Sequence, residues 1–134
     1  VTRAQMATFL ERALSFPITS TDFFTDDNGS VHEDAINRMA ADGVTLGCGT
    51  GLYCPADSIT RAQMASFLAR ALDLPVSGTD YFSDDEATPH EDNINKIAKA
   101  GVTLGCSTGL YCPESLVTRG QMAAFLHRAL EPTG

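Results

Sequence analysis

Three stretches of the chain carry the same hydrophobic stripe. In the second stretch, Met64, Phe67, Leu68 and Leu72 follow one another at spacings of three and four residues, the period of one helical face. The equivalent residues of the other two stretches are Met6, Phe9, Leu10 and Leu14, and Met122, Phe125, Leu126 and Leu130. This pattern predicts three amphipathic helices whose methionines and phenylalanines share one core.

Each of these helices begins at a Thr-Arg pair. Thr60 is a favourable N-cap residue, and Gln63 stands three residues later, where its side chain completes a capping box. The same two residues recur as Thr2 with Gln5 and as Thr118 with Gln121. Three equal start signals therefore support three equal helices.

A second kind of helix is predicted between these stretches. Ser30 and Glu33 match a capping box at its start, Ile36 and Met39 face inward, and Gly43 is a natural C′ residue at its end. The copy carries Thr88, Glu91, Ile94, Ile97 and Gly101 at these places. We therefore predict five helices, and an all-α fold.

An internal repeat underlies this arrangement. The Thr-Arg motif recurs with a period of 58 residues, and residues 1–58 share 35 identical positions with residues 59–116. Residues 117–134 restart the unit. Such a period indicates a repeat architecture in which each unit packs against related units.

Four cysteines flank two glycine-rich turns. Cys48 and Cys54 are six residues apart, and Cys106 and Cys112 repeat this spacing. Short β-prone arms on either side of each turn predict a small hairpin, which brings the two sulfurs within disulfide reach. A zinc site made by all four thiolates is the alternative, although zinc ligand pairs usually stand two to four residues apart. The favoured local disulfides indicate an oxidising, extracellular environment.

Composition narrows the possible functions. The 134 residues carry a net charge of −8, which argues against a nucleic acid partner because phosphate binding needs clustered Lys and Arg. No apolar run reaches the roughly 18 residues of a membrane span. The chain opens on helix-like sequence without a signal peptide, as expected of a mature protein or an excised fragment.

The order of four elements resembles the S-layer homology family. Its repeats have a Phe-x-Asp start, a helix, a glycine-containing turn and a Thr-Arg-Ala helix, matched here by residues 24–26 and 82–84, 47–55 and 105–113, and the three Thr-Arg motifs. The resemblance implies a pseudo-three-fold domain with a central three-helix bundle, helical prongs and small disulfide-pinned hairpins. It divides the chain into the core helix of a first repeat (1–20), a complete second repeat (21–78) and a complete third repeat (79–134).

The resemblance also implies a function. The family docks proteins non-covalently on the bacterial cell surface by binding an anionic cell-wall polysaccharide, so we expect a secreted anchoring module. The alternative is a structural subunit of an extracellular layer or filament that assembles through its repeats, either with further repeats of this kind or with copies of itself. No catalytic motif appears in the sequence, and no enzyme activity or cofactor is expected.

Arginines at the helix starts are the candidate glycan ligands. Arg3, Arg61 and Arg119 each stand in the first turn of a Thr-Arg helix, where free N–H groups and the helix dipole favour an anion. A guanidinium adds paired donors for a carboxylate or a pyruvate ketal. We expect Asp26 and Asp84 to belong to the same carbohydrate-binding site, where they orient these arginines. The alternative is a structural ion pair between the arginines and Asp26 or Asp84, and both can hold at once.

Acidic residues gather around the start of each second helix. Asp26 and Asp27 precede His32, Glu33 and Asp34, and the copy has Asp84, Asp85, His90, Glu91 and Asp92. Ca²⁺ favours carboxylates, but the spacing does not match an EF-hand loop. Acids at a helix start are also stabilised by the helix dipole. We therefore interpret them as helix-start residues and assign no metal ligand, although the sequence does not exclude calcium.

Overall fold

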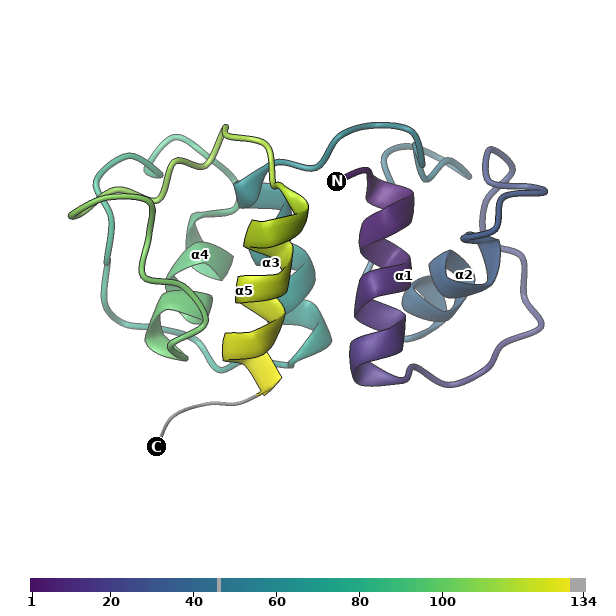
Figure 1. Ribbon diagram of the computed structural model, residues 1–134, viewed down its shortest axis with the longest axis horizontal. Coiled ribbons are helices and arrows are strands. Elements are labelled where there is room, and N and C mark those ends of the chain that lie inside the picture. The colour runs from purple at the N-terminus through teal and green to yellow at the C-terminus, as the bar shows by residue number, and fades with distance from the viewer. Residues whose placement is uncertain (46, 131–134) are drawn as a thin grey trace. The chain divides into compact units, whose positions relative to one another are not determined.

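The described part of this chain contains five α-helices (Figure 1). The computed structural model describes residues 1–45 and 47–130, and within these ranges it contains no strand. The helices are α1 (Arg3–Leu14), α2 (Glu33–Ala41), α3 (Arg61–Ala71), α4 (Glu91–Lys99) and α5 (Arg119–Leu130). The prediction of an all-helical fold is therefore confirmed. None of the helices described is long and apolar enough to cross a membrane.

The chain divides into two compact units. The first unit, Val1–Ile59, holds α1 and α2, and the second, Thr60–Gly134, holds α3, α4 and α5. In each unit the shorter helix packs against the Thr-Arg helix that precedes it, α2 on α1 and α4 on α3. The largest fully buried side chains include Met6, Leu10, Ile36, Met39 and Tyr53 in the first unit, and Met64, Leu68, Ile94, Ile97 and Tyr111 in the second.

Polar contacts fix the short helix on the long one. The hydroxyl of Thr8 in α1 lies 2.6 Å from Nδ1 of His32, the N-cap residue of α2. Ser66 and His90 repeat this hydrogen bond at 2.6 Å in the second unit. In the first unit, Arg38 also forms a 2.7 Å ion pair with Glu11 of α1. Hydroxyl and imidazole thus set where each short helix begins.

The capping boxes of the Thr-Arg helices are confirmed. The Thr60 hydroxyl accepts the N–H of Gln63 at 3.1 Å, and the Gln63 side chain accepts the N–H of Thr60 at 3.0 Å. Thr2 with Gln5 and Thr118 with Gln121 form the same reciprocal pair. The local sequence rule therefore holds in all three copies, because both partners lie within one helical turn.

The predicted start of the short helices is wrong. We expected Ser30 to cap a helix with Glu33 at its third position, but α2 begins at Glu33 itself. The Ser30 hydroxyl accepts the N–H of His32 at 3.0 Å, two residues on, and its carbonyl accepts the N–H of Glu33. Serine thus closes a local turn that competes with helix formation. Thr88 does the same before α4.

The predicted ends of these helices are confirmed. Gly43 has a φ of +79°, and its N–H donates to the carbonyl of Ala40. The N–H of Val44 reaches back to the carbonyl of Met39 at 2.9 Å, which completes a Schellman motif. The same motif at Gly101 ends α4.

Both local disulfides are confirmed, but the hairpins are reduced to turns. Cys48 is bonded to Cys54 and Cys106 to Cys112, with Cα–Cα distances of 6.1 and 6.0 Å. Among the described residues around the two turns only isolated bridges form, between Gly49 and Leu52 in the first unit and between Ser107 and Leu110 in the second. The predicted β arms do not extend because other groups take the backbone N–H groups of the second arm, as described below.

The expected three-fold arrangement stays a prediction, as does the division into a partial first repeat and two complete repeats. Five of the six residues expected in a shared core are buried: Met6, Met64, Met122, Phe67 and Phe125. Phe9 is half-buried. The start of each stripe is thus buried, whereas Leu14, Leu72 and Leu126 are half-buried and Leu130 is exposed, and one core shared by all three helices stays a prediction.

Two glycines of the second turn offer a matched test of its packing. Gly105 and Gly109 both have positive φ, +88° and +72°, so alanine costs about 1 kcal/mol at either place from backbone strain. A Cβ on Gly105 would also lie 2.5 Å from the carbonyl oxygen of Leu110 and 2.7 Å from the ring of Phe82, whereas one on Gly109 meets open space. We predict that Gly105→Ala lowers the free energy of unfolding in urea by about 3 kcal/mol and Gly109→Ala by about 1 kcal/mol. Equal losses would contradict this packing.

Candidate functional site

In the second unit, a buried arginine and a buried tyrosine are joined by two hydrogen bonds and a guanidinium–ring contact. We call this set of contacts the clasp. The Nε of Arg61 donates to the carbonyl oxygen of Tyr111 at 2.8 Å, and the Tyr111 hydroxyl donates to the carbonyl oxygen of Arg61 at 2.7 Å. The guanidinium lies 4.6 Å from the centre of the tyrosine ring. Burial raises the pKa of Tyr111 above its ordinary value, against the opposing charge of Arg61, so the hydroxyl keeps the proton that it donates.

The first unit repeats this arrangement. Arg3 donates to the carbonyl of Tyr53 at 2.8 Å, the tyrosine hydroxyl returns a 2.7 Å hydrogen bond, and the guanidinium lies 4.6 Å from the ring centre. The exposed fractions are 7% for Arg3 and 5% for Arg61. These candidate ligands are therefore part of the core, with little surface open to solvent.

Backbone carbonyls occupy the helix start beside each of these arginines. The N–H of Arg61 donates to the carbonyl of Ser115 at 2.8 Å, and the N–H of Ala62 to that of Pro113 at 3.0 Å. At the start of α1, the carbonyls of Asp57 and Pro55 play the same part. The main-chain N–H groups of Arg3, Ala4, Arg61 and Ala62, which were expected to bind an anion, thus donate to carbonyls within the protein.

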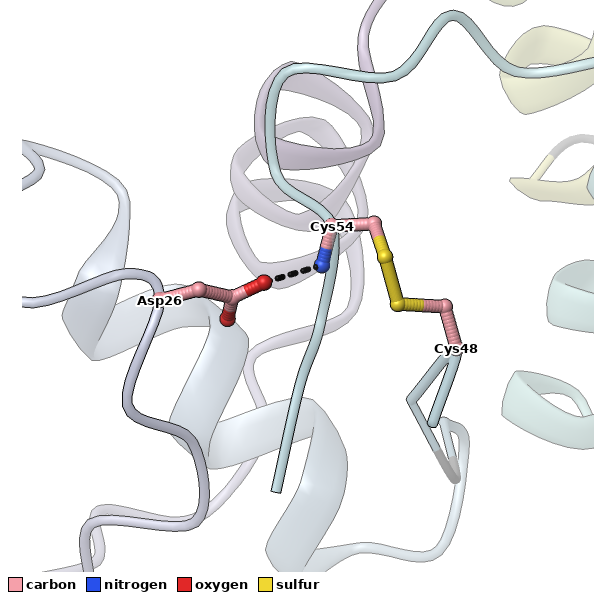
Figure 2. Close-up of side chains that lie close together, drawn as sticks. All are labelled: Asp26, Cys48 and Cys54. Atoms are coloured by element: carbon pink, nitrogen blue, oxygen red, sulfur yellow. Dashed lines mark hydrogen bonds between the residues drawn. A yellow bond between two sulfur atoms is a disulfide. The ribbon is translucent and has the colours of Figure 1, made fainter. Parts of the chain in front are cut away.

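Asp26 holds the disulfide turn through two hydrogen bonds to its backbone. Its carboxylate accepts the N–H groups of Tyr53 at 2.9 Å and Cys54 at 2.7 Å, the second of which Figure 2 shows beside the disulfide. Partial burial acts to raise the pKa of Asp26, but these two hydrogen bonds and the charge of Arg3 outweigh it and lower the pKa. The carboxylate thereby takes the donors that a β arm would have used.

Asp84 connects the turn of the second unit to its arginine. The Asp84 carboxylate accepts the N–H groups of Tyr111 at 2.9 Å and Cys112 at 2.8 Å, while the carbonyl of Tyr111 accepts Arg61 Nε. Asp84 thus binds the N–H of Tyr111, and Arg61 binds the carbonyl oxygen of the same residue. Asp84 is itself exposed.

Arg119 differs from its two equivalents. It begins α5, and it is exposed together with Gly120 and Ala123 on the next turn. The matching residues of the other helices are buried: Arg3, Ala4 and Ala7 in α1, and Arg61, Ala62 and Ala65 in α3. The repeat therefore has two covered copies of this face and one open copy.

A pocket of about 270 Å³ lies beside Arg61 in the second unit. The guanidinium of Arg61 is 5.2 Å from the ring centre of Phe125 in α5, so it lies between this ring and that of Tyr111. Arg128 contributes a second guanidinium, and the pocket is lined by Arg61, Thr103, Gly105, Cys106, Gln121, Ala124, Phe125 and Arg128. Two cationic groups and two neutral polar side chains suit a small anionic or hydroxyl-rich ligand.

The zinc alternative for the cysteines is wrong. The sulfurs of Cys48 and Cys54 come close to the carboxylate of Asp26, a grouping that resembles a metal site. The two sulfurs are bonded to each other, as Figure 2 shows, so no thiolate is available as a ligand. The second pair of cysteines is also a disulfide, and no cysteine is free among the described residues.

The acidic clusters differ from those expected from sequence. Carboxylates of Asp22, Asp27 and Glu33 lie within 4.8 Å of one another, and the second unit gathers Asp80, Asp85, Glu86 and Glu91. His32 and His90 instead bond to hydroxyls of the long helices. Burial, helped by the neighbouring charges of Asp80 and Glu91, raises the pKa of Asp85 to about 6. Burial likewise raises the pKa of Asp27.

The family model of the S-layer homology domain matches residues 23–65 and 81–123. The chain belongs to the S-layer homology family. Each match begins before a short helix and ends inside the following Thr-Arg helix, α3 or α5, whereas the short helix packs on the preceding one. Proteins of this family lie at the cell surface, and the S-layer homology module itself is non-catalytic.

The relatives include layer proteins and enzymes. The chain is 31% identical to an S-layer protein of Bacillus thuringiensis subsp. finitimus over 72% of its own length and 12% of the relative. It is 36% identical to an endoglucanase of Bacillus sp. (strain KSM-635) over 66% of the chain and 9% of that protein. An exoglucanase XynX of Acetivibrio thermocellus is 28% identical over 98% of the chain and 13% of its own length. The chain thus spans only about a tenth of these relatives.

Sequence reasoning missed two features of the site. Arg128 lines the pocket, but a single arginine near the end of a helix carries no signal of its own. The burial of Asp27 and Asp85 was missed too, although the repeated Asp-Asp pair offered a signal: one acid of the pair serves the turn and the other points into the protein.

Proposed function

We propose that this module anchors its protein non-covalently to the bacterial cell surface by binding an anionic cell-wall polysaccharide. Membership of the S-layer homology family supports the proposal, as do layer proteins among the relatives. The pocket beside Arg61 is the observation that carries it. A protein with a net charge of −8 does not attract a polyanion over long range, so binding depends on fixed local donors.

In this proposal the two arginines of the pocket have different roles. Arg128 is half-buried and supplies donors at the pocket wall, while Arg61 is held by its contacts with two aromatic rings and lines the same pocket. Asp84 acts on Arg61 through the backbone of Tyr111 and is a positioning residue. Asp26 does the same for Arg3 through Tyr53. Arg119, exposed at the start of α5, is a further contact.

Arg128→Ala tests the pocket without disturbing the Arg61 clasp. Losing one charge-assisted contact should weaken binding to purified cell walls about tenfold or more, measured by co-sedimentation. Arg61→Lys keeps the charge but loses the planar fork, and we expect a similar loss. Arg12→Ala is the matched control, because Arg12 is exposed near the end of α1 and is not among the residues that line this pocket.

Walls stripped of their secondary polysaccharide should retain none of the proteins. If Arg128→Ala and Arg61→Lys bind walls as the wild type does and keep its circular dichroism spectrum, the pocket is not the binding site. Equal binding to stripped walls would reject the polysaccharide as the ligand.

A second candidate is a structural subunit of an extracellular layer that assembles through its repeats, and the layer proteins among the relatives favour it. In α1 and α3 the equivalent face is covered by a turn that comes about 50 residues later, and the contact is made by the clasp between arginine and tyrosine. The exposed Gly120 and Ala123 leave room for the same kind of turn on α5. Under this proposal, another S-layer homology repeat provides it.

Sedimentation velocity across a concentration series separates the two candidates. An anchor that functions alone keeps one sedimentation coefficient, whereas a subunit that assembles through α5 forms larger species as the concentration rises. Ala123→Glu places a charge on the open face, and it should abolish such growth while leaving wall binding unchanged. Growth that persists in this variant would exclude α5 as the assembly surface.

A further inference from the structure

Each unit holds a cluster of carboxylates at the same three repeat positions. Asp22, Asp27 and Glu33 in the first unit correspond to Asp80, Asp85 and Glu91 in the second. Their carboxylate oxygens lie within 4.8 Å of one another. The second cluster has one acid more, Glu86, where the first unit has Asn28.

The central acid of each cluster is buried without a hydrogen-bond partner. Asp27 is 1% exposed and Asp85 is fully buried, and among the described residues neither carboxylate oxygen of either residue meets a donor. Burying a lone carboxylate costs several kcal/mol, so buried charges in proteins are paired or bind a metal. The neighbours of both residues are acids, and their like charge raises the cost of burying the carboxylate further.

The helix dipole does not account for these residues. It explains Glu33 and Glu91, which are the first residues of α2 and α4. Asp27 and Asp85 stand six residues earlier, before the turn that Ser30 or Thr88 closes, and they accept none of the free N–H groups of the helix. A positively charged group is the missing element.

We propose that each cluster binds one Ca²⁺ ion. Calcium takes oxygen ligands at about 2.3–2.6 Å, so two oxygens that share an ion lie up to about 5 Å apart, as these carboxylates do. The buried aspartate supplies the innermost ligand. Asp22 or Asp80, which are exposed, and Glu33 or Glu91, which are half-buried, close the site from outside.

The chemistry of the ligands favours calcium over other cations. The clusters consist of oxygen ligands alone, and the nearby His32 and His90 are engaged with hydroxyls, which argues against zinc. Magnesium is seldom held by a cage made wholly of protein groups. Four carboxylates bind more strongly than three, so the second cluster has the higher affinity. Extracellular calcium sites have dissociation constants on the order of 10⁻⁴–10⁻³ M.

Calorimetric titration of the chelator-treated protein with CaCl₂ tests the proposal directly. We expect one ion per cluster, a rise in Tm with Ca²⁺ and a much smaller rise with the same concentration of MgCl₂. Asp85→Asn should remove the tighter site and Asp27→Asn the weaker one. Asp92→Asn and Asp42→Asn, exposed acids outside the clusters, are matched controls that should keep both sites.

A crossover in stability distinguishes a ligand from a merely structural acid. With EGTA present, Asp85→Asn should have a Tm equal to or above that of the wild type, because it removes an unpaired buried charge; with saturating Ca²⁺ it should fall below the wild type. If a buried variant fails to fold, Glu91→Gln at the cluster edge should still weaken binding about tenfold. No calcium binding by the wild type, equal binding of magnesium, or unchanged binding in these variants would overturn the proposal.

Discussion

In each unit the guanidinium of a buried arginine lies against a tyrosine that comes 50 residues later in the chain. A desolvated arginine–ring contact of this kind is worth about 2 kcal/mol, and the two hydrogen bonds that accompany it are fully buried. The clasp links the two ends of the unit, because it bonds the turn that follows the short helix to the start of the long helix. Several other features of the unit hold the tyrosine of this contact in place.

Those features are layered around the tyrosine backbone. Asp84 accepts the N–H of Tyr111 and the disulfide at Cys112 fixes the next residue, while Gly105 leaves room for the Phe82 ring that lies 5.4 Å from the tyrosine ring. An acid, a glycine, a disulfide and an aromatic pair thus position one carbonyl, and Arg61 binds it. The same residue that closes the core also lines the pocket, so packing and proposed ligand binding share one side chain.

The sequence predicted those features whose partners are near one another in the chain. The capping box of Thr60 and Gln63, the helix end at Gly43 and both disulfides join residues that are at most six positions apart, and all are confirmed. The start at Ser30 was wrong because a serine hydroxyl can close a local turn as well as cap a helix, and here it closes the turn. The burial of Arg61 was not predictable, because its partner Tyr111 comes 50 residues later and does not affect the pattern of hydrophobic residues along the helix.

A double-mutant cycle of Arg61 and Tyr111 measures the clasp itself. Unfolding in urea, with the disulfides intact, gives the free energies of the wild type, Arg61→Met, Tyr111→Leu and the double variant. If the clasp closes the unit, the sum of the two single losses in unfolding free energy exceeds the loss in the double variant by about 1–2 kcal/mol. The reason is that each single change already breaks the shared contact. Losses that simply add would show that the two residues contribute independently, and would contradict the account.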